Sequence, residues 1–307
     1  MAVATKERWP ELDYDQWADT LETVHMWTQI VGKTKLANCP FLNQWWEIGF
    51  QLTPVGLTSG QMESAEGLLA IDFDFLEHVL TMRASSGLTR SISLYPRSVA
   101  DFFEEYQRTI ALFGVAPIKL AAPAEVPDPI PFAKDTIHAS YDPDAVIRWF
   151  RVMASISPVL QRYRSPFTGK SSPILFYWGS FDLNATRFSG RNVTPPAGPR
   201  FYQLAENQEN ISCGFWPGNV SASGSKLGKA AFYAYTFPSP KGLDNAHIEP
   251  AAAHWDKTFG EFIYLYDDLR SEDDPDAALL SFFESTYRAG AGLANWDLDQ
   301  LEQHDIR

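Results

Sequence analysis

Apolar side chains recur at helical spacing near the start of the chain. Over residues 14–33, Trp17, Leu21, Val24 and Val31 are separated by four, three and seven residues, which places them on one face of a helix. Three later segments each follow a residue type that caps helix N-termini, and two of these caps are followed directly by proline. Helices are therefore predicted over 14–33, 99–113 after Ser98, 143–163 after Asp142, and 276–289 after Asp274.

Other segments alternate apolar and polar side chains, which is typical of β-strands with one buried face. Within 68–75, Ile71 and Phe73 alternate with Asp72 and Asp74. Together with the helices, these segments predict an α+β fold with mixed or mostly antiparallel sheets and flanking helices. Further strands are predicted over 45–53, 80–83, 89–94, 173–187 with a break near Gly179, 231–237 and 261–266.

Two segments carry the residues of turns and connections. Five prolines between residues 115 and 140 exclude a long helix or a central strand there. Residues 191–230 are rich in Gly, Pro, Ser and Asn and are predicted to form a long loop region. We therefore expect an N-terminal half over 1–114, a connector over 115–140 and a C-terminal half over 141–307, packed as one compact unit.

The order of predicted elements recurs in the two halves. Pro54-Val-Gly-Leu57 matches Pro240-Lys-Gly-Leu243, and each half ends in a helix that contains Phe-Phe-Glu. One interpretation is an internal duplication with halves related by a pseudo-twofold axis, where ligand sites often lie. The alternative is coincidence, because such short matches arise easily by chance.

Acidic residues outnumber basic ones by 38 to 25, which gives a formal net charge of −13. Nucleic-acid-binding proteins carry basic stripes, and none is present here; the acidity also disfavours an anionic membrane surface. No apolar stretch reaches the roughly 20 residues that span a bilayer, and no secretory signal is recognisable. We expect a cytoplasmic protein with reduced Cys39 and Cys213 and without nucleic-acid or membrane partners; the oligomeric state stays open.

Aromatic residues make up 14% of the chain, including ten tryptophans. Many lie in clusters such as Trp45-Trp46 and Phe215-Trp216. One explanation is a core built from aromatic strands. The other is an aromatic-lined pocket, because small-molecule sites are mostly apolar with a few polar groups.

The segment from Trp178 to Arg191 has the richest candidate chemistry. If this segment is extended, its alternation places Ser180 and Asp182 on the same face as Trp178. Arg187 and Arg191 follow, and guanidinium groups bind carboxylates and phosphates through paired hydrogen bonds. The competing interpretation is an ordinary sheet face with a structural Asp–Arg pair.

Three of the six histidines are candidates for chemistry: His25, His78 and His138. His25 or His138 beside Asp182 could perform acid–base work, because histidine titrates near neutral pH. No His-x-His or His-x-x-x-His spacing occurs, so the three are only weak candidates for metal ligands. No cofactor is assigned, and a structural role for each histidine stays open.

Several motifs are specific when they are taken together. The set resembles a family of uncharacterised, mostly bacterial proteins that is known as a domain of unknown function, and the resemblance covers nearly the whole chain. It implies a shared architecture and no particular activity. Family members often carry histidine near Trp45-Trp46, where this chain has Gln44 and Glu47, so no metal site is expected there. The motifs are His25-Met-Trp-Thr-Gln-Ile-Val-Gly-Lys33, Asp72-Phe-Asp-Phe-x-x-His78, Pro127-Asp-Pro-Ile-Pro-Phe132, His138-Ala-Ser-Tyr-Asp-Pro143, Trp178-Gly-Ser-Phe-Asp-Leu183 and Thr186-Arg-Phe-Ser-Gly-Arg191.

The first functional hypothesis is an enzyme that acts on a small polar or anionic metabolite. Asp182 with His25 or His138, beside Ser180, would transfer protons. The second hypothesis is a non-catalytic protein that binds a small molecule or a partner in the same pocket, and the third is a metalloenzyme that uses the histidines. In the first hypothesis the substrate is held by Arg187, Arg191, Trp178, Trp46 and Trp216.

Overall fold

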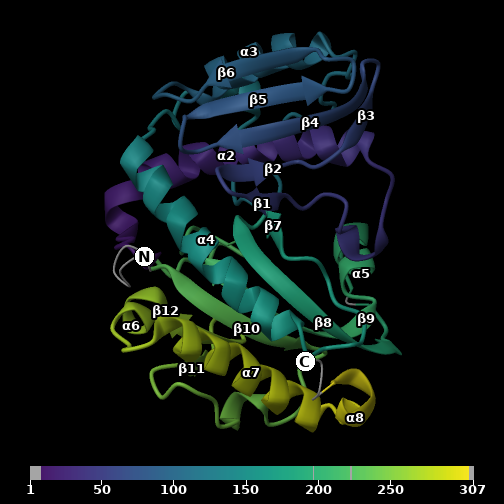
Figure 1. Ribbon diagram of the computed structural model, residues 1–307, viewed down its shortest axis with the longest axis vertical. Helices are drawn as coiled ribbons and strands as arrows, with labels where there is room; N and C mark the ends of the chain where they lie inside the picture. Colours follow the sequence, from purple (N-terminus) through teal and green to yellow (C-terminus); the bar gives the residue numbers. More distant parts are fainter. Residues whose placement is uncertain (1–7, 196, 222, 304–307) are drawn as a thin grey trace.

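The computed structural model describes residues 8–195, 197–221 and 223–303 (Figure 1). It consists of two antiparallel six-stranded sheets with flanking helices, which confirms the α+β class. The helices are α2 Tyr14–Asn38, α3 Val99–Ala111, α4 Pro143–Arg164, α5 Arg200–Ala205, α6 Tyr266–Arg270, α7 Pro275–Leu293 and α8 Leu298–Leu301.

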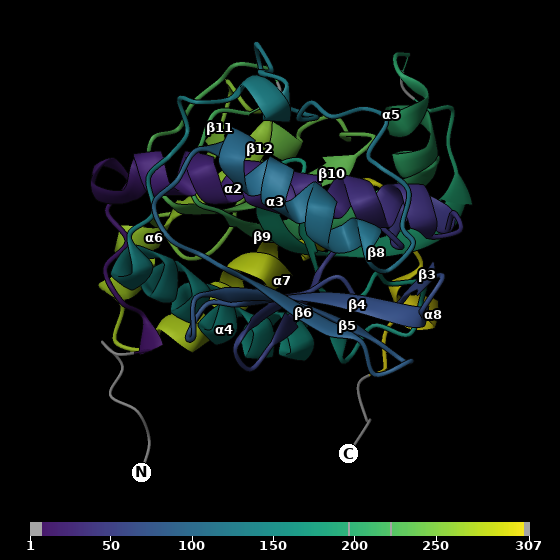
Figure 2. The ribbon, with the colours of Figure 1, turned by 90° about the horizontal axis from the view of Figure 1, so that it is seen from above.

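The first sheet has one buried and one polar face. Its buried face carries Ile71 and Phe73 from its longest strand, while Asp72 pairs with Arg83 of the next strand on the other face at 3.1 Å. Figure 2 shows α2 and α3 together on one side of this sheet. Its strands are β1 Gln51–Thr53, β2 Gly56–Thr58, β4 Gly67–Asp74, β5 Val79–Ala84 and β6 Thr89–Ser93 in that spatial order, with β3 Met62–Ser64 beside β4.

The second sheet separates a packed layer from a cavity. Leu183, Phe215 and Phe232 are in register on the face covered by α4 and α7, whereas Asn184 and Tyr233 lie on the opposite face. Figure 2 shows α4 and α7 on one side of this sheet and α5 on the other. The order of its strands is β11 His254–Asp256, β12 Glu261–Leu265, β10 Ala231–Phe237, β9 Gln208–Trp216, β8 Asp182–Asn192 and β7 Leu175–Tyr177.

One continuous hydrophobic core joins the two sheets. Trp149 of α4 stacks on Phe181 at 4.9 Å between ring centroids and also contacts Phe75, which follows β4. Phe50 and Phe176 exchange backbone hydrogen bonds of 2.8 Å between the two sheets. Aromatic rings bury large areas in such contacts, so these contacts help to hold the two sheets together.

The structure confirms the predicted helices together with their caps. The side chains of Ser98, Asp142 and Asp274 accept hydrogen bonds from the first turns of α3, α4 and α7. Proline lies in the first turn of α4 and α7, where it removes no helical hydrogen bond.

Two local predictions were wrong. Residues 45–53 are not one strand, because the left-handed backbone of Gln44 and Trp45 starts a turn and β1 begins only at residue 51. The segment 191–230 contains α5 and the central strand β9. β9 was missed because its Asn, Ser and Gly residues, which suggest a loop, lie on the cavity face of a sheet.

A duplication is not shown by the structure. Residues 54 and 55 form the turn between β1 and β2 and residues 56 and 57 begin β2, whereas residues 240–243 lead into a short 3-10 helix. The spatial orders of the strands also differ between the two sheets.

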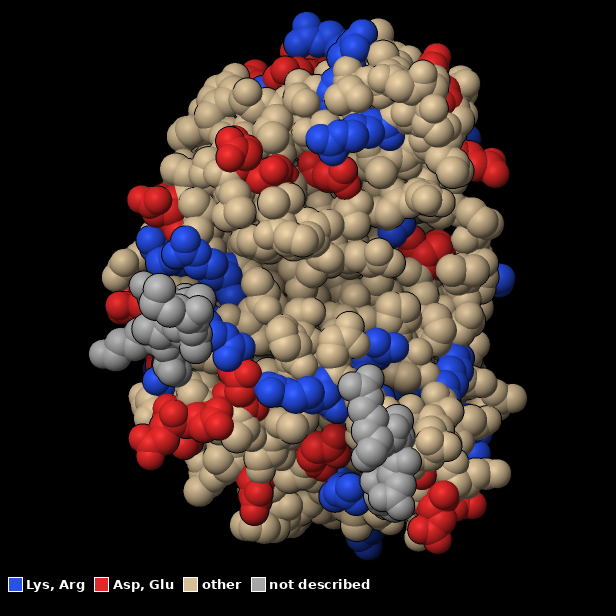
Figure 3. All heavy atoms as spheres, viewed as in Figure 1, with Lys and Arg blue, Asp and Glu red and all other residues tan. Residues whose placement is uncertain are grey.

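Within the described residues, none of the helices combines the length and the apolar character that a bilayer crossing requires. On the face shown in Figure 3, acidic and basic side chains lie interspersed, without a large area of one sign. The net negative charge is therefore not concentrated on this face.

Candidate functional site

A cavity of about 840 Å³ lies on the face of the second sheet that α4 and α7 leave uncovered. Its floor comes from strands β8, β10 and β12. Its walls come from the end of α2, the connector near Glu125, and α5. Nine aromatic residues line it: Trp45, Tyr177, Trp178, Phe201, Tyr202, Trp216, Tyr233, Tyr235 and Phe259.

Asp182 is the most fully hydrogen-bonded acidic group in the cavity. The residue is only 6% exposed, and its carboxylate accepts hydrogen bonds from the hydroxyl groups of Ser180 and Tyr233 and from Asn184 Nδ2 at 2.9 Å. Burial raises its pKa, and the three donors partly offset this effect. Gly214 makes the approach possible, because a β-carbon there would come 2.8 Å from the Tyr233 hydroxyl.

A tight turn between β7 and β8 presents Ser180 and Asp182 to the cavity. Phe181 has a left-handed backbone (φ 63°), and its side chain is buried in the core on the other side of the sheet. Trp178 packs so closely on α2 that a β-carbon at Gly32 would lie 2.2 Å from its ring. The indole also donates to the carbonyl of Ile48 at 3.0 Å, so both sides of the turn are anchored.

His25 and Gln29 of α2 hold this turn from behind. His25 Nε2 lies 3.1 Å from the carbonyl oxygen of Trp178 and 3.0 Å from that of Gly179, so this nitrogen carries a proton and donates. Burial lowers the pKa of His25 to about 4, which keeps the ring neutral. Gln29 binds the backbone of Ala124 through both ends of its amide, at 2.7 and 3.0 Å, and so ties the connector to the turn.

Glu125 and Glu261 bring two further carboxyl groups to the cavity. No described residue donates a hydrogen bond to either side chain. Burial, followed by the charge of Asp182, raises the pKa of Glu125 to about 7, with an opposing effect of Lys33. Burial and then Asp182 also raise the pKa of Glu261 to about 7. Buried carboxyl groups that titrate near neutrality in a cavity are typical of functional sites.

Two of the predicted substrate-binding residues lie elsewhere. Arg187 points to the α4 and α7 side of the sheet, where its guanidinium lies 3.6 Å from the Tyr163 ring centroid and pairs with Glu284 at 3.1 Å. Arg191 pairs with Glu209 and donates to backbone carbonyls at the end of α7. Neither guanidinium lines the cavity, because β8 alternates its side chains between two faces.

The predicted pairing of Asp182 with a histidine is not formed. His25 is bound to backbone carbonyls, and His138 Nδ1 lies 2.7 Å from Asp135. His78 Nδ1 lies 2.8 Å from the Tyr141 hydroxyl. Among the described residues, no group of three or more His, Cys, Asp or Glu side chains is arranged to hold a metal ion.

The three predicted tryptophans differ in position. Trp178 and Trp216 line the main cavity. Trp46 lines an adjoining hollow of about 100 Å³, which shares Tyr177 and Asn184 with the cavity.

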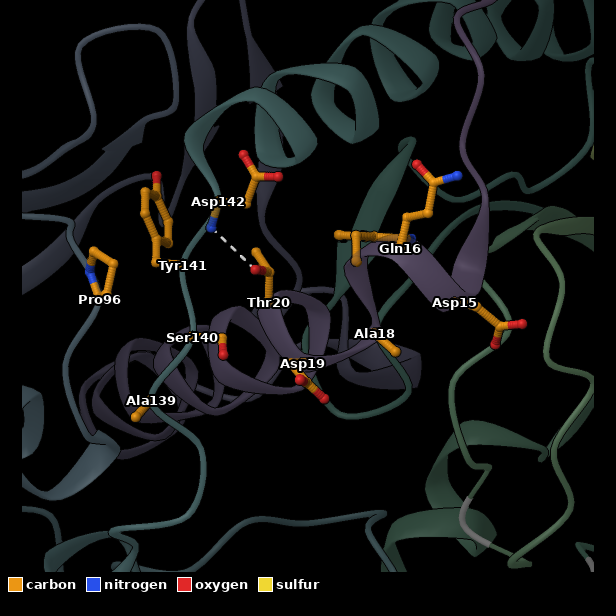
Figure 4. A pocket seen from close by; sticks show the side chains of 11 residues that line it. Asp15, Gln16, Ala18, Asp19, Thr20, Pro96, Ala139, Ser140, Tyr141 and Asp142 are labelled. Carbon is orange, nitrogen blue, oxygen red and sulfur yellow. Dashed lines mark hydrogen bonds between the residues drawn. The ribbon is translucent and has the colours of Figure 1, made fainter.

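The motif that contains His138 serves the architecture. An open hollow of about 410 Å³ lies between the start of α2 and residues 139–142 (Figure 4). There the backbone amide of Asp142 donates to the Thr20 hydroxyl at 3.0 Å, and the Asp142 carboxylate caps α4. These polar groups are already engaged in holding the connector on α2.

Sequence patterns did not identify Glu125, Glu261, Tyr233 or Tyr235 as site residues. Glu125 lies in a proline-rich segment without periodicity. Along β10, Phe232 and Ala234 alternate with Tyr233 and Tyr235. This alternation was a usable signal, because it places both tyrosines on one face of the strand.

The chain belongs to a family of unknown function, DUF5996, whose model matches residues 9–303. Comparisons with curated proteins and with solved structures found no match.

Proposed function

We propose that this protein is an enzyme that transfers protons to and from a small polar molecule bound in the aromatic cavity. The observation that carries the proposal is the pair of carboxyl groups of Glu125 and Glu261, which face the cavity without a hydrogen-bond donor among the described residues. A general acid or base works best with a pKa near the ambient pH, and both groups have a pKa of about 7.

Asp182 has a different role in this proposal. Its three hydrogen-bond donors fix its position, and its charge favours the protonated forms of the two glutamates. His25 is a positioning residue, because it holds the carbonyl groups of the turn and lies outside the cavity lining. The nine aromatic side chains exclude water from the bound molecule. An anionic substrate is disfavoured, since Arg187 and Arg191 do not line the cavity and its carboxyl groups outnumber its basic side chains.

Binding without turnover is the second candidate function. It is favoured by one observation: no histidine is among the residues that line the cavity in the described part of the chain. In that case the carboxyl groups would recognise the ligand and would not react with it.

One experiment separates the two candidates. The protein is incubated with a mixture of common metabolites and followed by proton NMR, with saturation transfer to detect binding. Loss of a compound with the native protein supports an enzyme, and the Glu125→Gln/Glu261→Gln variant should then be slower by about 10²-fold or more. Binding of a compound without its loss supports the second candidate. If no compound binds and none is lost, both candidates are contradicted. Glu104→Gln, at an exposed position of α3, is the matched control.

A further inference from the structure

Beside Asp182, the cavity wall offers a ligand a group of hydrogen-bond acceptors. A hydroxyl group has one hydrogen to donate, and those of Ser180 and Tyr233 are both used on Asp182. Their oxygens therefore offer only lone pairs. The carboxyl groups of Glu125 and Glu261 add acceptor oxygens without a donor from any described residue. A ligand that matches this wall brings hydrogen-bond donors.

The charges of the residues that line the cavity also favour a ligand with hydrogen-bond donors. Four carboxyl groups line the cavity, and two basic side chains, Lys33 and Arg200, stand against them. The Lys33 Nζ atom lies 5.9 Å from the centroid of the Trp178 ring, a distance at which a cation is attracted by an aromatic face. A bound cation would meet the same combination of carboxylates and ring faces. The four carboxyl groups belong to Glu125, Asp182, Glu206 and Glu261.

The apolar part of the cavity lies toward its rim. Trp45 stacks on Phe201 at 5.6 Å between centroids, and Trp216 packs edge-on against Phe259 at 5.5 Å. Leu36 and Tyr202 also line the cavity while 40% of each residue is exposed. These side chains provide an apolar surface for the body of a ligand whose charged end reaches the carboxylates.

We propose that the ligand of this cavity is an organic cation with N–H donors, an amine or amidine, that carries an aromatic or aliphatic body. The inference rests on the proposed function and names its substrate class. The charged nitrogen lies among Asp182, Glu125 and Glu261, and the apolar body stacks on the tryptophan and phenylalanine rings. A neutral polyol brings no positive charge to these carboxyl groups, and a carboxylate is repelled by them.

The test measures the binding of matched probes to the full chain by calorimetry. One set is benzylamine, benzamidine, benzyl alcohol and benzoate; the second is tryptamine, tryptophol and indole-acetate. We expect the cations to bind and the alcohols and carboxylates of the same skeleton to bind about tenfold more weakly or not at all. Equal binding of the alcohols or carboxylates, or binding by no cation, would overturn the inference.

Three variants test the placement of the charge. Glu125→Gln and Glu261→Gln should each lower the affinity for the best-binding cation by about tenfold. Lys33→Gln should raise that affinity, because it removes a competing cation, and Glu104→Gln should leave it unchanged. Unchanged affinity in both glutamate variants, or a decrease with Lys33→Gln, contradicts the inference. Circular dichroism and melting curves check that each variant folds.

The two proposals can fail separately. If alcohols or carboxylates bind better than amines, the proposed cationic ligand is wrong, while the cavity is still a small-molecule site. If amines bind tightly but none is turned over, the cationic ligand is supported and the proposed catalysis is wrong.

Discussion

The carboxyl group of Glu125 lies directly over Gly179: a β-carbon at Gly179 would come within 2.3 Å of Glu125 Oε1. The turn between β7 and β8 and the proline-rich connector therefore meet at a position without a side chain. Gln29 holds the connector there, because its amide binds the backbone of Ala124, the neighbour of Glu125.

Gly179→Ala is expected to displace the Glu125 carboxyl group from the cavity wall. The affinity for a cationic probe should fall by about tenfold, as for loss of the charge itself, while the free energy of unfolding changes by about 1 kcal/mol or less. Calorimetry and urea unfolding measure the two effects. Unchanged affinity would show that the contact between the two residues is not important for the site.

The raised pKa values of Glu125 and Glu261 should appear in the pH dependence of the free energy of unfolding. The pKa of each is raised from its ordinary 4.5 to about 7, so the folded state holds protons that the unfolded chain releases. Stability from this source is fully present below 4.5 and is lost as the pH rises to about 7. Glu125→Gln and Glu261→Gln should therefore be more stable than the native protein at about pH 8, on the order of 1 kcal/mol, and this gain should shrink toward pH 5.

His25→Ala should destabilise the fold and weaken ligand binding together. The substitution leaves the carbonyl group of Trp178 without its donor and that of Gly179 with only Gln29 Nε2 at 3.3 Å, at a cost of about 1–3 kcal/mol. The native pKa of His25 is lowered from 6.5 to about 4, so its contribution is present above 6.5 and is lost as the pH falls through about 4. Urea unfolding between these pH values should show that the free energy of unfolding of the native protein falls as the pH is lowered. The variant should not show this decrease.

Two glycine-to-alanine substitutions in helices should have opposite effects. Gly32→Ala places a methyl group 2.2 Å from the Trp178 ring, and such overpacking costs about 1–3 kcal/mol. Gly292→Ala in α7 meets no atom within 4 Å and should stabilise by about 0.5–1 kcal/mol through helix propensity. Melting curves of the two variants compare these effects. Equal stability would mean that Trp178 moves away freely.

Arg187→Met should lower stability and leave the cavity intact. The substitution leaves Glu284 without its partner and removes the cation from between the rings of Tyr163 and Tyr287. Loss of one partner of a buried ion pair costs about 3–5 kcal/mol. Probe affinity, measured where the variant is folded, should match the native value; a loss would place Arg187 in the site after all.

The sequence by itself determined the elements whose signals are local. N-caps followed by apolar periodicity located α3, α4 and α7, and alternation located β4 and β10. It also placed Trp178, Ser180 and Asp182 together, although the structure brings them to the cavity through a turn and not along one extended strand. Local patterns failed at β9, where Asn210, Ser212 and Gly214 suggested a loop.

Only the tertiary structure decided which distant side chains meet. Asp182 is bound by Tyr233 from a strand 51 residues later rather than by a histidine, and Glu125 reaches the cavity through the connector that Gln29 of α2 holds in place. Arg187 is excluded from the cavity because it lies on the other face of β8. The physical reason is that spacing along a chain encodes the face of one element, whereas the packing of elements with one another decides what each face contacts.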